Sequence, residues 1–348
     1  MFRSDGGEQS DRVTVVSPNL LIVSDWANHA LAIDLGGDFG YHDDFDAEDY
    51  SDWFASIAPR VDVDEHTVLE LRLGHARQHI SRGSTETALQ GAEPSINASW
   101  DFRADWRYKA DKYSSNIRYD FLRTNARDVS QIDRDFLDND LHDFVFRQGY
   151  EFVPGTTIWL QPGYEAVNYR LSRDGFDVVR DNQGWTLLAG LTVNATAISF
   201  VEAGIGYMSR DFEQAGQDPY SGLAYEGRLV WNISNLVTLE LAGGRTARVV
   251  ESIAAPIAVD DSITFELAWD PRENLIFEAG AAYTLSEFET STGTGRGEDL
   301  LAANLKVRYL LSPNLFFEAT YTYEERDSTL LGDDFQANVY SIRAGLEL

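Results

Sequence analysis

Residues 96–109 read INASWDFRADWRYK, and their side chains alternate between apolar and polar. Ile96, Trp100 and Trp106 share one face of an extended chain, because successive side chains of a strand point to opposite sides. The other face carries five charges of both signs. A soluble sandwich could turn that face only toward bulk water, whereas a barrel could turn it toward a wet lumen. The stretch predicts a strand with one apolar face and one polar face.

The same period of two runs along the rest of the chain. Residues 263–270 and 315–324 repeat it, and helical spacing is absent. No stretch of about 18 consecutive apolar residues occurs, which excludes a membrane-spanning helix. We therefore predict an all-β protein, a transmembrane up-and-down antiparallel β-barrel. A soluble β-propeller or sandwich is the alternative fold.

Short and long connections alternate between the predicted strands. The short ones hold Pro, Asn or Gly, at residues 153–156, 232–235, 270–274 and 312–314. The long ones are acidic, at residues 43–52, 128–143, 211–218, 286–299 and 324–334. Hairpins spaced by about 40 residues also suit propeller blades, but each repeat here divides into two long strands. Short turns on one rim and long loops on the other are typical of outer-membrane barrels.

Seventeen strands are predicted, each long enough to cross the outer membrane. Bacterial single-chain barrels have an even number of strands, so we expect about 16–18, within one domain of residues 12–348. Residues 1–11 are expected to be disordered or the remnant of a truncated N-terminal segment. They lack the basic and apolar regions of a signal peptide, so we expect a mature, exported form. The predicted strands are 12–24, 29–42, 49–62, 66–79, 95–108, 113–126, 141–153, 156–170, 184–194, 197–212, 221–233, 236–250, 261–270, 274–288, 298–311, 315–327 and 335–348.

Charge and composition exclude several classes of function. The formal charge is −29, with 28 Lys and Arg against 57 Asp and Glu, which argues against a nucleic-acid partner. Cysteine is absent, so disulfides and thiolate metal sites are excluded. The sequence has no Gly-x-Ser-x-Gly elbow and no His-Glu-x-x-His motif. We expect no enzyme activity and no cofactor, with a barrel phospholipase as a remote alternative.

One segment resembles a known family. Val13-Thr14-Val15-Val16-Ser17-Pro18-Asn19-Leu20, then Ser24-Asp25-Trp26-Ala27-Asn28-His29-Ala30-Leu31 and the acidic end Glu48-Asp49-Tyr50-Ser51-Asp52, resemble outer-membrane β-barrel porins associated with exopolysaccharide synthesis and export. The resemblance extends through the later hairpins to the C-terminus. It implies a bacterial outer-membrane location, with lipid and lipopolysaccharide around the barrel. It also implies a role in polysaccharide secretion, with a polysaccharide and a periplasmic export lipoprotein as partners.

Charged residues of the polar face are the candidate lumen lining. They either form a ladder that orients a polar polymer, or pair with one another and only solvate the wall. Arg123 also belongs to this predicted set. The predicted lumen-lining residues are Asp101, Arg103, Asp105, Arg107, Arg118, Arg147, Glu202, Arg228, Glu240, Glu266, Glu278, Arg308, Glu318 and Arg343.

Aromatic residues of the apolar face are the candidate membrane anchors. The eight tryptophans are either sugar-stacking platforms or parts of the two aromatic girdles of a barrel, and the girdle is favoured. The predicted interface residues are Trp100, Trp106, Trp231, Trp269, Tyr321 and Tyr323.

No dedicated metal site is predicted. The acidic loops could attract Ca²⁺ through their carboxylates, but solvated loops are the simpler interpretation. His75 and His79 have the same strand parity and lie about 13 Å apart along a strand, too far for one ion. The favoured function is a pore that assists exopolysaccharide export. A general porin for small solutes and a plugged structural barrel are the alternatives.

Overall fold

The computed structural model describes residues 2–4, 7–24, 26–80, 94–128, 133–171, 179–196, 198–250, 257–290, 293–330 and 334–347. Parts of three predicted acidic loops lie outside these residues, at 129–132, 291–292 and 331–333. The strands are β1 (Phe2–Ser4), β2 (Gly7–Gln9), β3 (Val13–Val16), β4 (Asn19–Val23), β5 (His29–His42), β6 (Tyr50–Asp62), β7 (Thr67–Ile80), β8 (Ser95–Ala110), β9 (Tyr113–Ala126), β10 (Asn139–Val153), β11 (Thr156–Tyr169), β12 (Asn182–Thr196), β13 (Ser199–Phe212), β14 (Tyr220–Ser234), β15 (Val237–Val249), β16 (Ile257–Arg272), β17 (Leu275–Thr290), β18 (Gly293–Ser312), β19 (Leu315–Ser328) and β20 (Phe335–Leu346).

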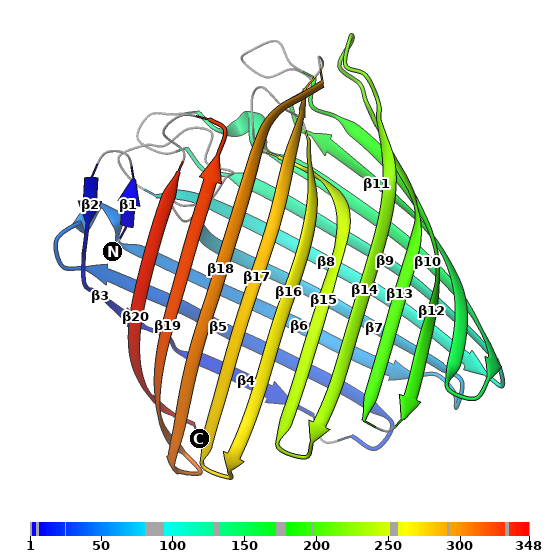
Figure 1. The fold of residues 1–348 in the computed structure, drawn as a ribbon, viewed down its shortest axis with the longest axis horizontal. Helices are drawn as coiled ribbons and strands as arrows, with labels where there is room; N and C mark the ends of the chain where they lie inside the picture. The colour runs from blue at the N-terminus through cyan, green and yellow to red at the C-terminus, as the bar shows by residue number, and fades with distance from the viewer. Residues whose placement is uncertain are drawn as a thin grey trace.

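All of these strands belong to one 20-stranded sheet in which neighbours run antiparallel. From β5 to β20 each strand pairs with the next one along the chain, as an up-and-down barrel requires. Figure 1 shows the strands from β13 to β20 crossing in front of those from β4 to β9, with β10–β12 joining the two walls at one side. The predicted fold class is confirmed.

The predicted strands coincide with the observed ones, with two differences. The strand expected at 12–24 is broken into β3 and β4 at Ser17-Pro18, because proline has no backbone N–H for the ladder. The acidic loop expected at 286–299 is wrong. β17 continues to Thr290 and β18 begins at Gly293, so most of this stretch pairs as an extended hairpin.

Two short strands extend the sheet beyond β20 at the rim that carries the long connections. β1 pairs with β2 and also with residues Phe335–Ala337 of β20, and β2 leads along the chain toward β3. Two short strands thus stand where disorder was expected for residues 1–11. That this segment is the remnant of a longer one stays a prediction.

Helical structure is limited to two short 3-10 turns in the described residues, η1 (Asp46–Glu48) and η2 (Asp135–Leu137). Across those same ranges, no helix is long and apolar enough to cross a membrane. The opposite rim holds tight turns. Gly155 follows Pro154 there and adopts a φ of +77°, a conformation that side chains with a Cβ rarely take.

Candidate functional site

One face of the sheet is a continuous apolar belt. Phe144 opposes Tyr164 across β10 and β11, and Ile205 opposes Tyr225 across β13 and β14. All four side chains are exposed although they are large and apolar. Exposed apolar side chains at alternate positions of successive strands are the pattern of a surface that contacts lipid.

Arg147 on β10 shows that the opposite face is the concave one. Its Nη1 donates to Glu202 Oε1 on β13 at 2.8 Å, and its Nη2 donates to Glu226 Oε1 on β14 at 3.0 Å. Four strand spacings of about 4.8 Å amount to roughly 19 Å along a flat sheet, more than these side chains can bridge. The wall must curve toward this face, which therefore lines the interior of the barrel.

The strand registers place all the predicted lumen-lining residues on the same face as Arg147. Most of them form ion pairs with a carboxylate or cation on a neighbouring strand or on their own strand. Glu266 stands directly opposite Glu240, and Arg343 directly opposite Glu318. The observed pairs are Arg103–Asp120, Arg107–Glu70, Arg118–Asp120 at 2.9 Å, Arg228–Glu240 at 2.6 Å, Lys306–Glu278 and Arg308–Glu318 at 2.8 Å. This arrangement favours mutual pairing over a free charge ladder.

The predicted interface aromatics lie on the apolar face, at two levels. Trp231 and Trp269 lie beside the tight turns, and Trp269 stacks on Phe277 with centroids 5.1 Å apart. Trp100 lies nearer the long connections and is 45% exposed. Trp106, Tyr321 and Tyr323 share this face, and Tyr321 stacks on Tyr340. Two levels suit two membrane interfaces, and the girdle role stays a prediction.

Trp159 does not belong with these anchors. It lies on the concave face and is only 5% exposed, beneath the guanidinium of Arg147, whose central carbon is 4.1 Å from the ring centroid. Its Nε1 donates to Thr192 Oγ1 at 3.0 Å. The sequence holds the signal, because Ile158 and Leu160 take the apolar phase of β11 and leave Trp159 in the polar phase.

A buried apolar cluster surrounds Trp159 and was not predicted. Leu188, Met208 and Ala224 occupy concave-face positions on β12, β13 and β14, and each is nearly inaccessible to solvent. The inner face of the wall is therefore closely packed where β11–β14 curve. We call Trp159, Leu188, Met208 and Ala224 the corner cluster.

Arg123 does not line the lumen as the sequence predicts. It lies on the outer face. It forms a two-pronged ion pair with Asp140, at 2.7 Å for both bonds. Both residues follow the parity of Trp100, which opposes Arg123 across β8 and β9. The pair lies near the long-connection rim, where an outward charge can reach headgroups or water.

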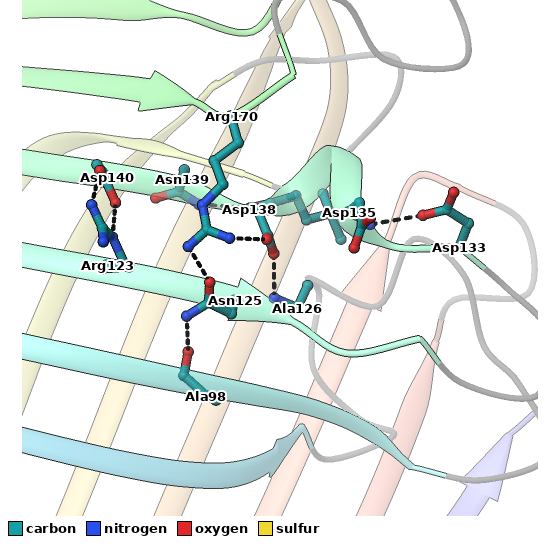
Figure 2. A network of polar contacts seen from close by, with 11 residues as sticks. Ala98, Arg123, Asn125, Ala126, Asp133, Asp135, Asp138, Asn139, Asp140 and Arg170 are labelled. Carbon is teal, nitrogen blue, oxygen red and sulfur yellow. Dashed lines mark hydrogen bonds and ion pairs between the residues drawn. The ribbon is translucent and has the colours of Figure 1, made fainter.

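A polar network ties together the strand ends beside that pair (Figure 2). Asp138 accepts from the backbone N–H of Ala126 at 2.8 Å and from Arg170 Nη1 at 2.9 Å. Arg170 also donates to Asn125, whose own side-chain amide donates to the carbonyl of Ala98. The network joins the ends of β8, β9, β10 and β11. Burial raises the pKa of Asp138, and the bonds from Ala126 and Arg170 partly offset this.

Three carboxylates gather next to this network. Asp128, Asp133 and Asp135 each offer an oxygen within 4.8 Å of the others, and all three are exposed. Asp128 and Asp133 already accept backbone N–H bonds, from Arg134 and Asp135. Carboxylate oxygens suit Ca²⁺, but exposed acidic groups commonly cluster without an ion.

The two histidines considered for a metal have separate partners. His75 stacks on Trp100 with centroids 4.1 Å apart, and its Nδ1 lies 2.6 Å from the carbonyl of Ser99. His79 Nδ1 lies 2.6 Å from Asp52 Oδ2. Each imidazole is held in a local contact.

A family model described as "Putative beta-barrel porin 2" matches residues 1–347. The chain belongs to this porin family. The porin therefore resides in the bacterial outer membrane, and its family and fold are those of a transport protein. No curated protein matches its sequence.

Solved outer-membrane structures resemble the porin in fold. The siderophore receptor PirA from Pseudomonas aeruginosa is 9% identical with a TM-score of 0.50, and the match covers 96% of this chain and 69% of PirA. The alcaligin receptor FauA from Bordetella pertussis is 10% identical (TM-score 0.49, 97% and 66% covered). The copper transporter OprC is 13% identical (TM-score 0.45), and the porin spans 62% of its length. At these identities PirA supports the barrel fold alone.

Proposed function

We propose that this porin is a water-filled pore that assists the export of an exopolysaccharide across the outer membrane. The observation that carries the proposal is the concave face, where charged side chains of both signs lie on β8–β10 and again on β13–β20. Such a face is costly in an apolar core but costs little beside water. The resemblance to porins of polysaccharide export systems supports the choice of substrate. Catalysis has no part in this function.

The pairing of the lumen charges suits a neutral or mixed-charge polymer. Arg228 donates from Nε and Nη2 to the two carboxylate oxygens of Glu240, and Arg308 bonds Glu318, so these cations are already neutralised. A wall of closed ion pairs offers hydrogen-bonding edges to sugar hydroxyls without a strong field of one sign. A passing polymer would therefore slide along the wall without being held.

A general porin for small solutes is the second candidate. Trp159, a tryptophan on the concave face, is covered by Arg147 and buried, so it presents no open platform to a sugar. A plugged structural barrel is the third candidate. It is favoured by buried residues near the long-connection rim, such as Phe136, Ala258 and Phe288.

Two experiments separate these candidates. Reconstitution in planar bilayers should give discrete conductance steps, and a silent bilayer containing heat-modifiable, folded protein would favour the plugged barrel. Deletion of the gene followed by assay of secreted polymer should lower secretion while the cell-associated polymer rises. Unchanged secretion in a strain whose protein conducts would favour the general porin.

A further inference from the structure

Arg147 contacts carboxylates on strands that are not adjacent to its own. It leaves β10, passes β11 and β12, and reaches the carboxylates of Glu202 and Glu226 on β13 and β14. Its Nε also donates to Gln161 Oε1 at 2.6 Å, so all three nitrogens of the guanidinium are bonded. The other predicted lumen arginines with observed carboxylate partners bond within their own strand or to a strand beside it, whereas Arg210 on the concave face of β13 also passes one strand to reach Glu165 on β11.

The corner cluster supports the guanidinium from below. The Trp159 ring lies over Gly190 and Gly204, where an added Cβ would come closer than 3.0 Å to the ring. These two glycines let the ring lie flat against β12 and β13. Arg147 then covers the ring, and stacking of this kind fixes a guanidinium plane.

The group formed by Arg147, Glu202 and Glu226 contains one cation and two carboxylates. Glu202 and Glu226 share one cation, and Thr192 Oγ1 donates to the second oxygen of Glu202 at 2.7 Å. Without Arg147, both carboxylates would lose their ion-pair partner, because Arg228, which stands directly opposite Glu202, is bonded to Glu240. Carboxylates that line a narrow pore attract cations and repel anions.

We propose that Arg147 is a positioning residue that sets the width and the ion preference of the pore, a role that rests on the proposed pore function. It ties β10 to β13 and β14 and so holds the wall in its curved form over the corner cluster. It also neutralises the inward carboxylates. Removal of Arg147 lets the curve relax, which widens the lumen, and it exposes negative charge.

The test compares wild type, Arg147→Ala, Arg147→Lys and Arg147→Ala combined with Glu202→Gln and Glu226→Gln. In planar bilayers Arg147→Ala should raise the single-channel conductance and shift the reversal potential in a KCl gradient toward K⁺. Arg147→Lys keeps the charge but cannot bond both carboxylates with one planar fork, so it should raise conductance with a smaller shift. The triple variant should keep the higher conductance and lose the shift.

Arg123→Ala is the matched control, because it removes an arginine of a two-pronged ion pair on the outer face. It should leave conductance and reversal potential at wild-type values. Heat-modifiable migration should show that every variant folds. Wild-type conductance and reversal potential in folded Arg147→Ala would overturn the proposal.

A second measurement does not depend on conduction. The chain has no cysteine, so spin labels can be attached at Phe144→Cys on β10 and Leu223→Cys on β14, both exposed on the apolar face. Arg147→Ala should lengthen and broaden the distance between the labels. If wild type does not conduct, the proposed function fails. An unchanged distance overturns the positioning role in either case.

Discussion

Trp100 and Arg103 lie three residues apart on β8, and their side chains lie on opposite faces of the wall. Trp100 stacks on His75 in the apolar belt, and Arg103 bonds Asp120 on the concave face. We expect Trp100→Asp to block assembly, because a carboxylate replaces an aromatic ring on a lipid-facing surface. Arg103→Ala should leave folding intact. Heat-modifiable migration after refolding into lipid vesicles measures both, and equal tolerance would contradict the assignment of faces.

Arg228 and Glu240 provide a test of how little a wet ion pair stabilises the barrel. Their two bonds, at 2.6 Å and 3.1 Å, join β14 to β15 on the concave face. The arginine side chain is 54% exposed, so solvent screens the pair. We expect Arg228→Gln to lower the free energy of unfolding by about 0–1 kcal/mol. Urea titration in vesicles is the measurement, and a loss well beyond this range would indicate a dry interior at this site.

Strand positions could be predicted from the sequence because lipid and water impose opposite requirements on alternate residues. That constraint acts at every residue of a spanning strand, so the hairpin ends at Asn235, Asn274 and Asn314 were located closely. Beyond the membrane the constraint stops. The predicted loop at 286–299 failed for this reason, since a strand outside the bilayer needs no apolar face.

The corner cluster could not be predicted, because it depends on curvature. Alternation assigns Trp159 to the inner face but does not say that Arg147, four strands away from Glu226, bends over it. Contacts between strands that are not neighbours depend on how sharply the sheet turns. Gly190 and Gly204 lie where the sheet curves, although glycine occurs in strands for other reasons as well.

Gly190 and Gly227 lie in neighbouring parts of the wall but differ in the space beside them. A Cβ at Gly190 would collide with the Trp159 ring and the carbonyl of Ala203, whereas at Gly227 it would meet nothing nearer than 3.9 Å. We expect Gly190→Ala to lower the free energy of unfolding by about 1–3 kcal/mol through overpacking. Gly227→Ala should be neutral or slightly stabilising. Urea titration of both variants would contradict this view of the corner if the two behaved alike.

Asp138, at the long-connection rim, should make the free energy of unfolding depend on pH. Burial holds its folded-state pKa above the unfolded value. Between the two values the folded protein binds more protons than the unfolded one, so the free energy of unfolding falls as pH rises through that window. Asp138→Asn keeps an acceptor oxygen for Ala126 and should remove this component. The charged groups facing it are Arg170, Asp135 and Asp128.

Asp64, in the tight turn between β6 and β7, supplies a control of opposite sign. The backbone N–H of His66 bonds its carboxylate and lowers its pKa, so its contribution to stability is present above the unfolded pKa and is lost as pH falls through the folded one. Urea midpoints should therefore be measured from pH 3 to pH 7. Asp138→Asn should remove a component of stability that falls as pH rises, and Asp64→Asn should remove a component that increases as pH rises. If Asp138→Asn kept the wild-type pH profile, the buried carboxylate would have to be charged throughout this range, and the network around Arg170 would be an ordinary ion pair.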